Sequence, residues 1–288
     1  MGGLGNQMFQ YAFGKAVSIQ SNHNLELDLT FLEKKDDIHE YTIRNYELNI
    51  FNLNSEIAGK EKVRSIRKAI DHPLLNRLNL KFPAFFSYHI FREKMFSFDP
   101  GYNKLKGNCY LEGYWQSEKY FKSIEELIRN EFEFISEPGE KNKELLKLIT
   151  ECESVSIHIR RGDMVSLKSA SDFHGTCSED YYEKGIKIIL QKLKNPIFFI
   201  FTDDPAWAAS RKLFSGYKII DWNTNANSYE DMRLMSNCKH HIIANSSFSW
   251  WGAWLNRNTD KIVIAPNNWF RDSTIDTSDL IPESWQRI

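Results

Sequence analysis

The sequence contains few cysteines and no long apolar run. Its four cysteines lie far apart in 288 residues and form no CxxC pair, so neither a zinc site nor a disulfide framework is indicated. We expect reduced thiols in a cytoplasmic protein. No run approaches the ~20 apolar residues of a membrane span, and no secretory signal is evident. These absences predict a soluble protein, with peripheral attachment to the inner membrane face left open.

The sequence also lacks an excess of charge of either sign, and it lacks the phosphate loop of many nucleotide hydrolases. A formal charge of −1 excludes the basic stripe that a nucleic-acid backbone requires. No GxxxxGK[ST] sequence occurs, which disfavours a nucleotide-dependent kinase or hydrolase. Any phosphate bound by this chain must therefore be neutralised by a few local groups.

The second half of the chain, residues 151–288, alternates short aliphatic runs with helical segments. This pattern is typical of a parallel sheet covered on both faces, as in doubly wound nucleotide-binding domains. The expected strands are 155–159, 197–201, 217–220, 240–244 and 262–265. The expected helices are 179–193, 205–214, 228–237 and 246–256.

The first half, residues 1–150, is less regular but also indicates α/β structure. Apolar residues at helical spacing predict a helix over 6–21, and a basic stretch predicts another over 59–80. Strands are expected at 25–29 and 108–112, with a helix at 117–131. A turn at Glu137-Pro138-Gly139 suits an interdomain connection. We expect two Rossmann-like domains that face each other across a cleft.

Residues 154–163, SVSIHIRRGD, look like a buried strand that ends in charges. With a period of two, His158 and Arg160 point to the face opposite the aliphatic residues. Two guanidiniums at the end of a strand suit a diphosphate, because arginine forks match phosphate oxygens bidentately. The alternative is an internal ion pair with Asp163, which we expect for at most one of Arg160 and Arg161.

Polar residues follow two other expected strands, where ligands of open α/β sheets bind. Asp203 and Asp204 could accept hydrogen bonds from a base or ribose, or one of them could cap the next helix. Asn245, Ser246 and Ser247 lead straight into a helix, whose first turn suits an anion. Simple capping by Asn245 or Ser246 is the alternative for that stretch.

Several motifs together resemble the bacterial α-1,2-fucosyltransferase family, and the order of the motifs matches along nearly the whole chain. The resemblance rests on GGLGNQMFQYAFG (2–14), GYWQSEKYF (113–121), HIRRGD (158–163), HGTCSEDYY (174–182), FTDD (201–204) and IIANSSFSWWGAWL (242–255). It implies a GT-B-like fold and transfer of L-fucose from GDP-β-L-fucose to the 2-hydroxyl of a terminal β-galactoside, with inversion. It further implies no obligatory metal, no other cofactor and a place in O-antigen synthesis.

The resemblance also implies roles for individual residues. Arg160 is expected to contact the diphosphate, with His158 and Asp163 as further catalytic residues. The donor-binding residues are expected to be Gly3, Asn6, Gln7, Arg161, Asp203, Asn245, Ser246, Ser247 and Phe248. Trp115, Asp172 and His174 are acceptor-side candidates. The general base is open between Asp163 and His158, with Asp172, His174 and Glu112 as weaker alternatives.

The amino terminus departs from the family pattern, because Met1 directly precedes GGLGNQ where a short strand is usual. The first strand of the amino-terminal domain is therefore expected to be missing, or the native start to lie upstream. The alternative function is a non-catalytic protein of the same fold that binds a nucleotide sugar or a glycan.

Overall fold

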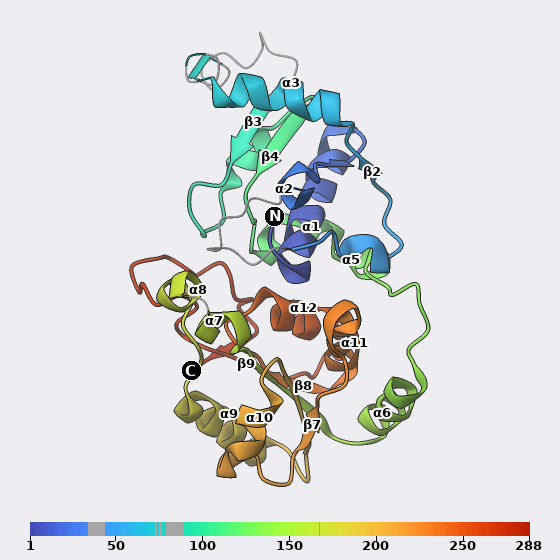
Figure 1. Cartoon of the computed structure of the whole chain (residues 1–288), viewed down its shortest axis with the longest axis vertical. Coiled ribbons are helices and arrows are strands. Elements are labelled where there is room, and N and C mark those ends of the chain that lie inside the picture. Colours follow the sequence, from blue (N-terminus) through green and yellow to red (C-terminus); the bar gives the residue numbers. More distant parts are fainter. Residues whose placement is uncertain (34–43, 73, 75–76, 79–88, 167) are drawn as a thin grey trace. The chain divides into compact units, whose positions relative to one another are not determined.

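The computed structural model in Figure 1 contains two compact units. Its described residues are 1–33, 44–72, 74, 77–78, 89–166 and 168–288, with the backbone alone at 69–71, 163, 166, 168–170 and 225. Described residues before Ser136, together with Asp276–Leu280, belong to unit 1. Unit 2 contains Ser136–Ile275 and Ile281–Ile288.

Unit 2 is built on a six-stranded sheet in the order β10-β9-β8-β5-β6-β7, and every pairing is parallel. The strands are β5 (Ser154–Ile159), β6 (Ile197–Thr202), β7 (Lys218–Ile220), β8 (His240–Ile242), β9 (Val263–Ala265) and β10 (Gln286–Arg287). The five predicted strands are confirmed, whereas the short edge strand β10 was not predicted. The jump from β5 to β8 makes the sheet doubly wound, as expected.

Helices cover both faces of this sheet, with α9 and α10 below it and α11 and α12 above it in Figure 1. The helices of unit 2 are α6 (Glu140–Glu151), α7 (Gly162–Ser166), α8 (Lys168–Phe173), α9 (Glu179–Lys192), α10 (Pro205–Ser210), α11 (Tyr229–Asn237) and α12 (Ser247–Leu255). Two 3₁₀ turns complete the unit, η6 (Lys212–Phe214) and η7 (Asn225–Asn227). The predicted helices at 179–193, 228–237 and 246–256 are confirmed, and the one at 205–214 divides into α10 and η6.

Strand β5 lies in the middle of the sheet and is buried along its whole length. Val155, Ile157 and Ile159 join an apolar cluster with residues of α9 and β6. On the opposite face, the Ser156 hydroxyl contacts His241 Nδ1 at 2.8 Å, and His158 follows in the same row. The alternation predicted for this strand therefore separates an apolar face from a buried polar one.

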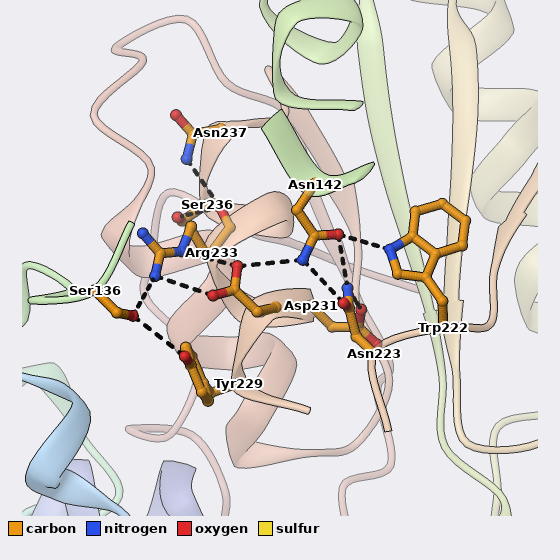
Figure 2. Close-up of polar contacts among 10 residues, drawn as sticks. Ser136, Asn142, Trp222, Asn223, Tyr229, Asp231, Arg233, Ser236 and Asn237 are labelled. Carbon is orange, nitrogen blue, oxygen red and sulfur yellow. Dashed lines mark hydrogen bonds and ion pairs between the residues drawn. The ribbon is translucent and has the colours of Figure 1, made fainter. Parts of the chain in front are cut away.

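A polar network joins α6 to the start of α11 (Figure 2). Asn142 accepts from Trp222 Nε1 at 2.7 Å and donates to Asn223 Oδ1 at 2.9 Å. Glu230 and Arg233 form a buried ion pair at 3.0 Å, and Arg233 also donates to the Ser136 hydroxyl at 3.1 Å. These contacts place α6 in unit 2, so the division falls after Ile135 and not after Thr150 as expected.

Unit 1 is assembled around α1 (Leu4–Ser21), whose buried side contains most of its apolar residues. Phe13 lies at ring-centroid distances of 4.4 Å from Trp115 and 4.7 Å from Tyr120. The other elements are β1 (Glu26–Leu27), α2 (Thr30–Glu33), η1 (Leu48–Ile50), β2 (Glu56–Ile57), α3 (Lys60–Asp71), β3 (His89–Arg92), η3 (Pro100–Lys104), β4 (Cys109–Glu112), η4 (Glu118–Tyr120), η5 (Lys122–Ile124) and α5 (Glu125–Glu131). Its described strands form two parallel pairs, β1 with β2 and β3 with β4.

The α/β class is confirmed in unit 1, but several predicted elements differ in extent. The strand expected at 25–29 is reduced to Glu26–Leu27. The helix expected at 117–131 begins as two 3₁₀ turns and becomes α-helical only at Glu125, after Ser117 caps the first turn. The helix expected at 59–80 is α3, which ends at Asp71, and part of the remainder lies outside the described residues.

Candidate functional site

The carboxyl ends of β5 and β6 bring Arg160 and Asp203 together. Ile159 is in register with Thr202 in this parallel pair, so the residues that follow them lie side by side. Arg160 Nη1 contacts Asp203 Oδ2 at 2.8 Å. The other oxygen, Asp203 Oδ1, accepts from the backbone N–H of Arg161 at 2.8 Å. One carboxylate therefore orients both the first guanidinium and the backbone that carries the second.

The second guanidinium, that of Arg161, is held by Asp204 and Trp207. Arg161 Nε donates to Asp204 Oδ2 at 3.1 Å, and the guanidinium lies over the Trp207 ring at 4.3 Å. Asp204 Oδ1 also accepts from the Trp207 N–H at 3.0 Å, so it caps α10. Such stacking and ion pairing fix a side chain that otherwise samples many rotamers.

Both guanidiniums contact internal carboxylates, whereas an ion pair of either arginine with Asp163 stays a prediction. The carboxylates belong to Asp203 and Asp204, while the Asp163 side chain lies outside the described residues. Each arginine side chain keeps about a quarter of its surface exposed, at 25% and 21%. A guanidinium has five N–H groups, more than one carboxylate accepts, so the pairing is compatible with a ligand.

His158 is buried on the polar face of β5, two residues before Arg160. Its Nδ1 atom is shielded from solvent and has no hydrogen-bond partner among the described residues. The ring lies 5.8 Å from that of Phe248, the predicted donor-binding residue in the first turn of α12. Burial lowers the pKa of His158 from 6.5 to about 4, with Asp203 opposing this shift and Arg160 reinforcing it. The imidazole is therefore neutral at pH 7.

The residues before α12 divide into a buried support and a partly exposed first turn. Asn245 is buried, and its amide donates to the carbonyl oxygens of His174, Gly175 and Trp269 at 3.1, 3.2 and 3.2 Å. Its Oδ1 accepts from the Cys177 thiol at 3.5 Å. The expected contact between this side chain and a nucleotide therefore needs correction, since the amide holds the loop after α8 and the loop after β9 instead.

Ser246 caps α12, as the capping alternative predicts. Its hydroxyl accepts from the Phe248 N–H at 3.3 Å, and Ser249 then begins the buried part of the helix. Ser246, Ser247 and Phe248 are all partly exposed. They lie at the carboxyl edge of the sheet, because α12 follows β8, the neighbour of β5. Their predicted contacts with a donor stay predictions.

Asp172 and His174 lie in unit 2, around the end of α8. Asp172 is exposed, and its carboxylate is 4.0 Å from Arg271 Nη1. The His174 ring stands edge-on to Phe173 at 4.8 Å and lies 5.5 Å from Phe270. The loop between β9 and β10 therefore supports this end of α8. An acceptor-side role for either residue stays a prediction.

The glycine turn of unit 1 places Gly3 at the N-cap of α1, with Asn6 and Gln7 in the first turns of that helix. Gln7 is buried, and its amide donates to the carbonyl oxygens of Gly2 and Asn45 at 2.9 and 2.8 Å. Gln7 Oε1 accepts from the Glu47 N–H at 3.0 Å. Gln7 thus fixes the turn from within, which corrects the expectation that its side chain reaches a ligand.

Trp115 corrects another expectation, because it is a core residue and no sugar platform. Its side chain is 1% exposed and stacks on Phe91 with ring centroids 5.3 Å apart. The residue has a φ of 58°, a left-handed conformation that is rare for tryptophan. The Glu93 carboxylate accepts from the N–H groups of Tyr114 and Trp115 at 2.7 and 2.8 Å and so supports this backbone.

Two of these supporting residues, Trp207 and Glu93, were not predicted individually, and neither was Gln116, whose amide donates to Asn6 Oδ1 at 2.7 Å. Only Gln116 lies within a motif that carries the family resemblance, and no local pattern marks Trp207 or Glu93 as parts of a site. Their positions depend on tertiary contacts that no sequence periodicity encodes.

Comparison with known proteins places this chain in a family. The model of the family described as "Glycosyl transferase family 11" matches residues 1–288. The chain belongs to glycosyl transferase family 11. It is thus a glycosyltransferase, and the resemblance deduced from its motifs is confirmed at the level of the family.

Three relatives align with nearly the whole of this chain. An α-1,2-colitosyltransferase of Escherichia coli is 39% identical over 100% of this chain and 96% of its own length. The O-antigen biosynthesis glycosyltransferase WbnK of Escherichia coli is 34% identical over 99% and 97%. A galactoside 2-α-L-fucosyltransferase of Caenorhabditis elegans is 22% identical over 99% of this chain and 77% of its own.

Among solved structures, the NodZ α-1,6-fucosyltransferase soaked with GDP-fucose is similar to this chain, with 12% identity, a TM-score of 0.45 and coverage of 88% and 89%. Within the described part of the chain, no helix is both long and apolar enough to cross a membrane. The expectations of a cytoplasmic location, of peripheral attachment and of metal-independent activity stay predictions.

Proposed function

We propose that the protein transfers L-fucose from GDP-β-L-fucose to the 2-hydroxyl of a terminal β-galactoside, with inversion, during O-antigen synthesis. Membership of glycosyl transferase family 11 supports sugar transfer. The names of the O-antigen glycosyltransferase from Escherichia coli and of the 2-α-L-fucosyltransferase from Caenorhabditis elegans support the process and the linkage. The sugar and the acceptor come from the motif resemblance.

The observation that carries this proposal is the pair of arginines at the end of β5. Arg160 and Arg161 are held by Asp203 and Asp204, so both guanidiniums are oriented before a ligand arrives. Pre-orientation lowers the entropy that binding would otherwise lose. A diphosphate offers several anionic oxygens to guanidinium forks, and Arg160 would exchange part of its contact with Asp203 for phosphate.

The chemistry requires stabilisation of a leaving group. Departure of GDP leaves growing negative charge on its terminal phosphate, and donors placed at that charge lower the barrier. Arg160 supplies a fixed positive charge there, and the first turn of α12 supplies backbone N–H groups and the Ser247 hydroxyl. His158 is neutral at pH 7. It therefore suits a hydrogen bond to the sugar or the acceptor, while the choice of Asp163 or His158 as general base stays a prediction.

A colitosyl group is the second candidate for the transferred sugar. The α-1,2-colitosyltransferase is 39% identical to this chain, a higher identity than that of the 2-α-L-fucosyltransferase at 22%. Both names give an α linkage to a 2-position, and they differ in the sugar that is transferred. Offering both activated sugars to the same preparation of the protein, and measuring which one is transferred, decides between them.

The direct test is incubation of the protein with GDP-fucose and lactose in the presence of EDTA. We expect a fucosylated product, and Arg160→Ala should lower kcat by about 10²- to 10³-fold, the loss seen when one donor to a developing oxyanion is removed. Arg211→Ala is the control, because Arg211 lies over the same Trp207 ring as Arg161, at 5.0 Å, but does not follow β5. Calorimetry with GDP should show weaker binding only for Arg160→Ala.

Two results would redirect this proposal. Turnover of activated colitose, with none of GDP-fucose, would reassign the donor. GDP binding without turnover of any nucleotide sugar, and unaffected by Arg160→Ala, would favour a non-catalytic binding protein and remove the arginine pair from the site.

A further inference from the structure

Arg161 meets an aromatic side chain at the carboxyl edge of the sheet in unit 2. Its guanidinium lies over the Trp207 ring at 4.3 Å, and its Nε donates to Asp204 Oδ2 at 3.1 Å. We infer that Trp207 is a positioning residue, which holds the two terminal amino groups of Arg161 in place for the anionic oxygens of a diphosphate. This inference deepens the proposed function and rests on it, and every residue that it uses belongs to unit 2.

The contacts of Arg161 leave one edge of its guanidinium for a ligand. Asp204 accepts from Nε, whereas Nη1 and Nη2 have no hydrogen-bond partner among the described residues. Neither of these atoms is among the shielded polar atoms that lack a partner, so both are open to solvent. The terminal N–H groups of a guanidinium match the oxygens of a phosphate. Arg161 can therefore bind an anion without giving up its internal carboxylate, unlike Arg160, whose Nη1 already contacts Asp203.

Stacking on Trp207 determines the direction of this free edge. A single hydrogen bond from Nε leaves the planar guanidinium free to turn about that bond. An aromatic ring within about 6 Å attracts the face of the guanidinium and so restricts the rotation. A flexible side chain that is immobilised on binding costs free energy. Because the indole already restricts Arg161, less of this cost remains when a diphosphate binds.

Trp207 is able to fix Arg161 because the indole is itself held in place. The Trp207 N–H donates to Asp204 Oδ1 at 3.0 Å, so it shares a carboxylate with Arg161. The indole packs against the apolar cluster of the sheet and lies 6.1 Å from the ring of Phe214, which is buried. Asp204 thus holds both the guanidinium and the helix that carries the ring, and the two cannot shift independently of each other.

Two substitutions of Trp207 separate the aromatic face from apolar packing. Trp207→Phe keeps a ring for the guanidinium, so calorimetry with GDP should give a dissociation constant within about twofold of the wild type. Trp207→Leu keeps apolar packing against Phe214 but removes the ring, so GDP should bind about 2- to 10-fold more weakly, the cost of ordering one long side chain on binding. Tyr217→Leu is the matched control, because Tyr217 packs against the same apolar cluster but directly precedes β7, at the opposite edge of the sheet.

The effect of Trp207 should depend on the presence of Arg161. Arg161→Ala should lower both GDP binding and kcat/KM for GDP-fucose, because the free edge of the guanidinium is lost. In that background Trp207→Leu should cause no further fall in kcat/KM, a quantity that stays measurable where binding is weak. An indole that stacks on the base, or that only stabilises the fold, would instead lower kcat/KM by the same factor in both backgrounds. Trp207→Met is the ringless substitute if Trp207→Leu does not fold.

Three results would overturn the inference. Trp207→Leu could bind GDP as tightly as Tyr217→Leu, Arg161→Ala could bind GDP as tightly as the wild type, or the effect of Trp207→Leu could persist in the Arg161→Ala background. Wild-type protein that neither binds GDP nor turns over a nucleotide sugar would refute the proposed function, and the inference with it. An active wild type with an unaffected Trp207→Leu variant would refute only the role of Trp207.

Discussion

Replacing Asp231 with asparagine tests the polar network that joins α6 to α11 (Figure 2). Burial raises the pKa of the Asp231 carboxyl from 3.8 to about 7, with Glu230 adding to the rise and a hydrogen bond from Asn223 opposing it. The folded chain therefore binds a proton that the unfolded chain releases near pH 4. Stability from this group is full at acidic pH and is lost as pH rises through about 7.

The two pKa values set the size of the effect. With one carboxyl titrating at 3.8 in the unfolded chain and at about 7 in the folded chain, linkage predicts that about 2.7 kcal/mol of unfolding free energy is lost between about pH 5 and pH 8. This is an upper bound, because part of the Asp231 side chain reaches solvent. Asparagine resembles the protonated carboxyl and still accepts from Asn223, so the variant should lose none of this energy.

Urea unfolding followed by circular dichroism, repeated across this pH range, measures the difference. Relative to the wild type, Asp231→Asn should gain about 2.7 kcal/mol of stability between pH 5 and pH 8, and the two proteins should match only below about pH 4. Asp221→Asn is the control, because Asp221 is exposed in the same segment between β7 and α11 and its loss tests the removal of charge alone. Parallel pH profiles for wild type and Asp231→Asn would refute the reasoning, since they would show an ordinary carboxyl.

Two other substitutions probe the carboxyl edge of the sheet, one after β5 and one after β8. Gly162→Ala should weaken GDP binding, because the added Cβ would lie 2.8 Å from Asp203 Oδ2 and displace the carboxylate that orients Arg160. Gly139→Ala is the control, because a Cβ added there would have no atom within 4 Å, and GDP binding measured by calorimetry should be unchanged. Asn245→Ala should lower the unfolding free energy by about 1–3 kcal/mol through unpaired carbonyl groups, with a fall in melting temperature, and equal stability would contradict the described clamp.

Local sequence patterns predict unit 2 well, because its strands are short aliphatic runs or alternate strictly and most of its helices are amphipathic. Ser178 and Ser246 act as caps from sequence-local geometry, so both helix starts could be predicted. Strand β10 could not, since two residues become a strand only by pairing with β9. Register is likewise a tertiary property, and it is register that brings Arg160 beside Asp203.

The site was predicted by residue type more successfully than by residue role. Arg160, Arg161, Asp203 and Asp204 do meet, as their positions after neighbouring strands suggested. Burial, however, determines what a polar side chain is able to do. The amide of Asn245 donates to three carbonyl groups, and the Trp115 side chain is buried in the core. In both cases the surrounding residues are distant in sequence.

Residues 276–280 have a consequence for how the protein can be dissected. Asp279 accepts from the Phe98 N–H at 2.8 Å and pairs with Lys119 at 2.6 Å, whereas the residues directly after this segment end in β10 of the other unit. No single cut in the gene therefore yields both units intact. A chimaera that exchanges the amino-terminal unit must carry this short carboxyl-terminal piece from the same parent, and a stop codon before residue 276 would damage both halves at once.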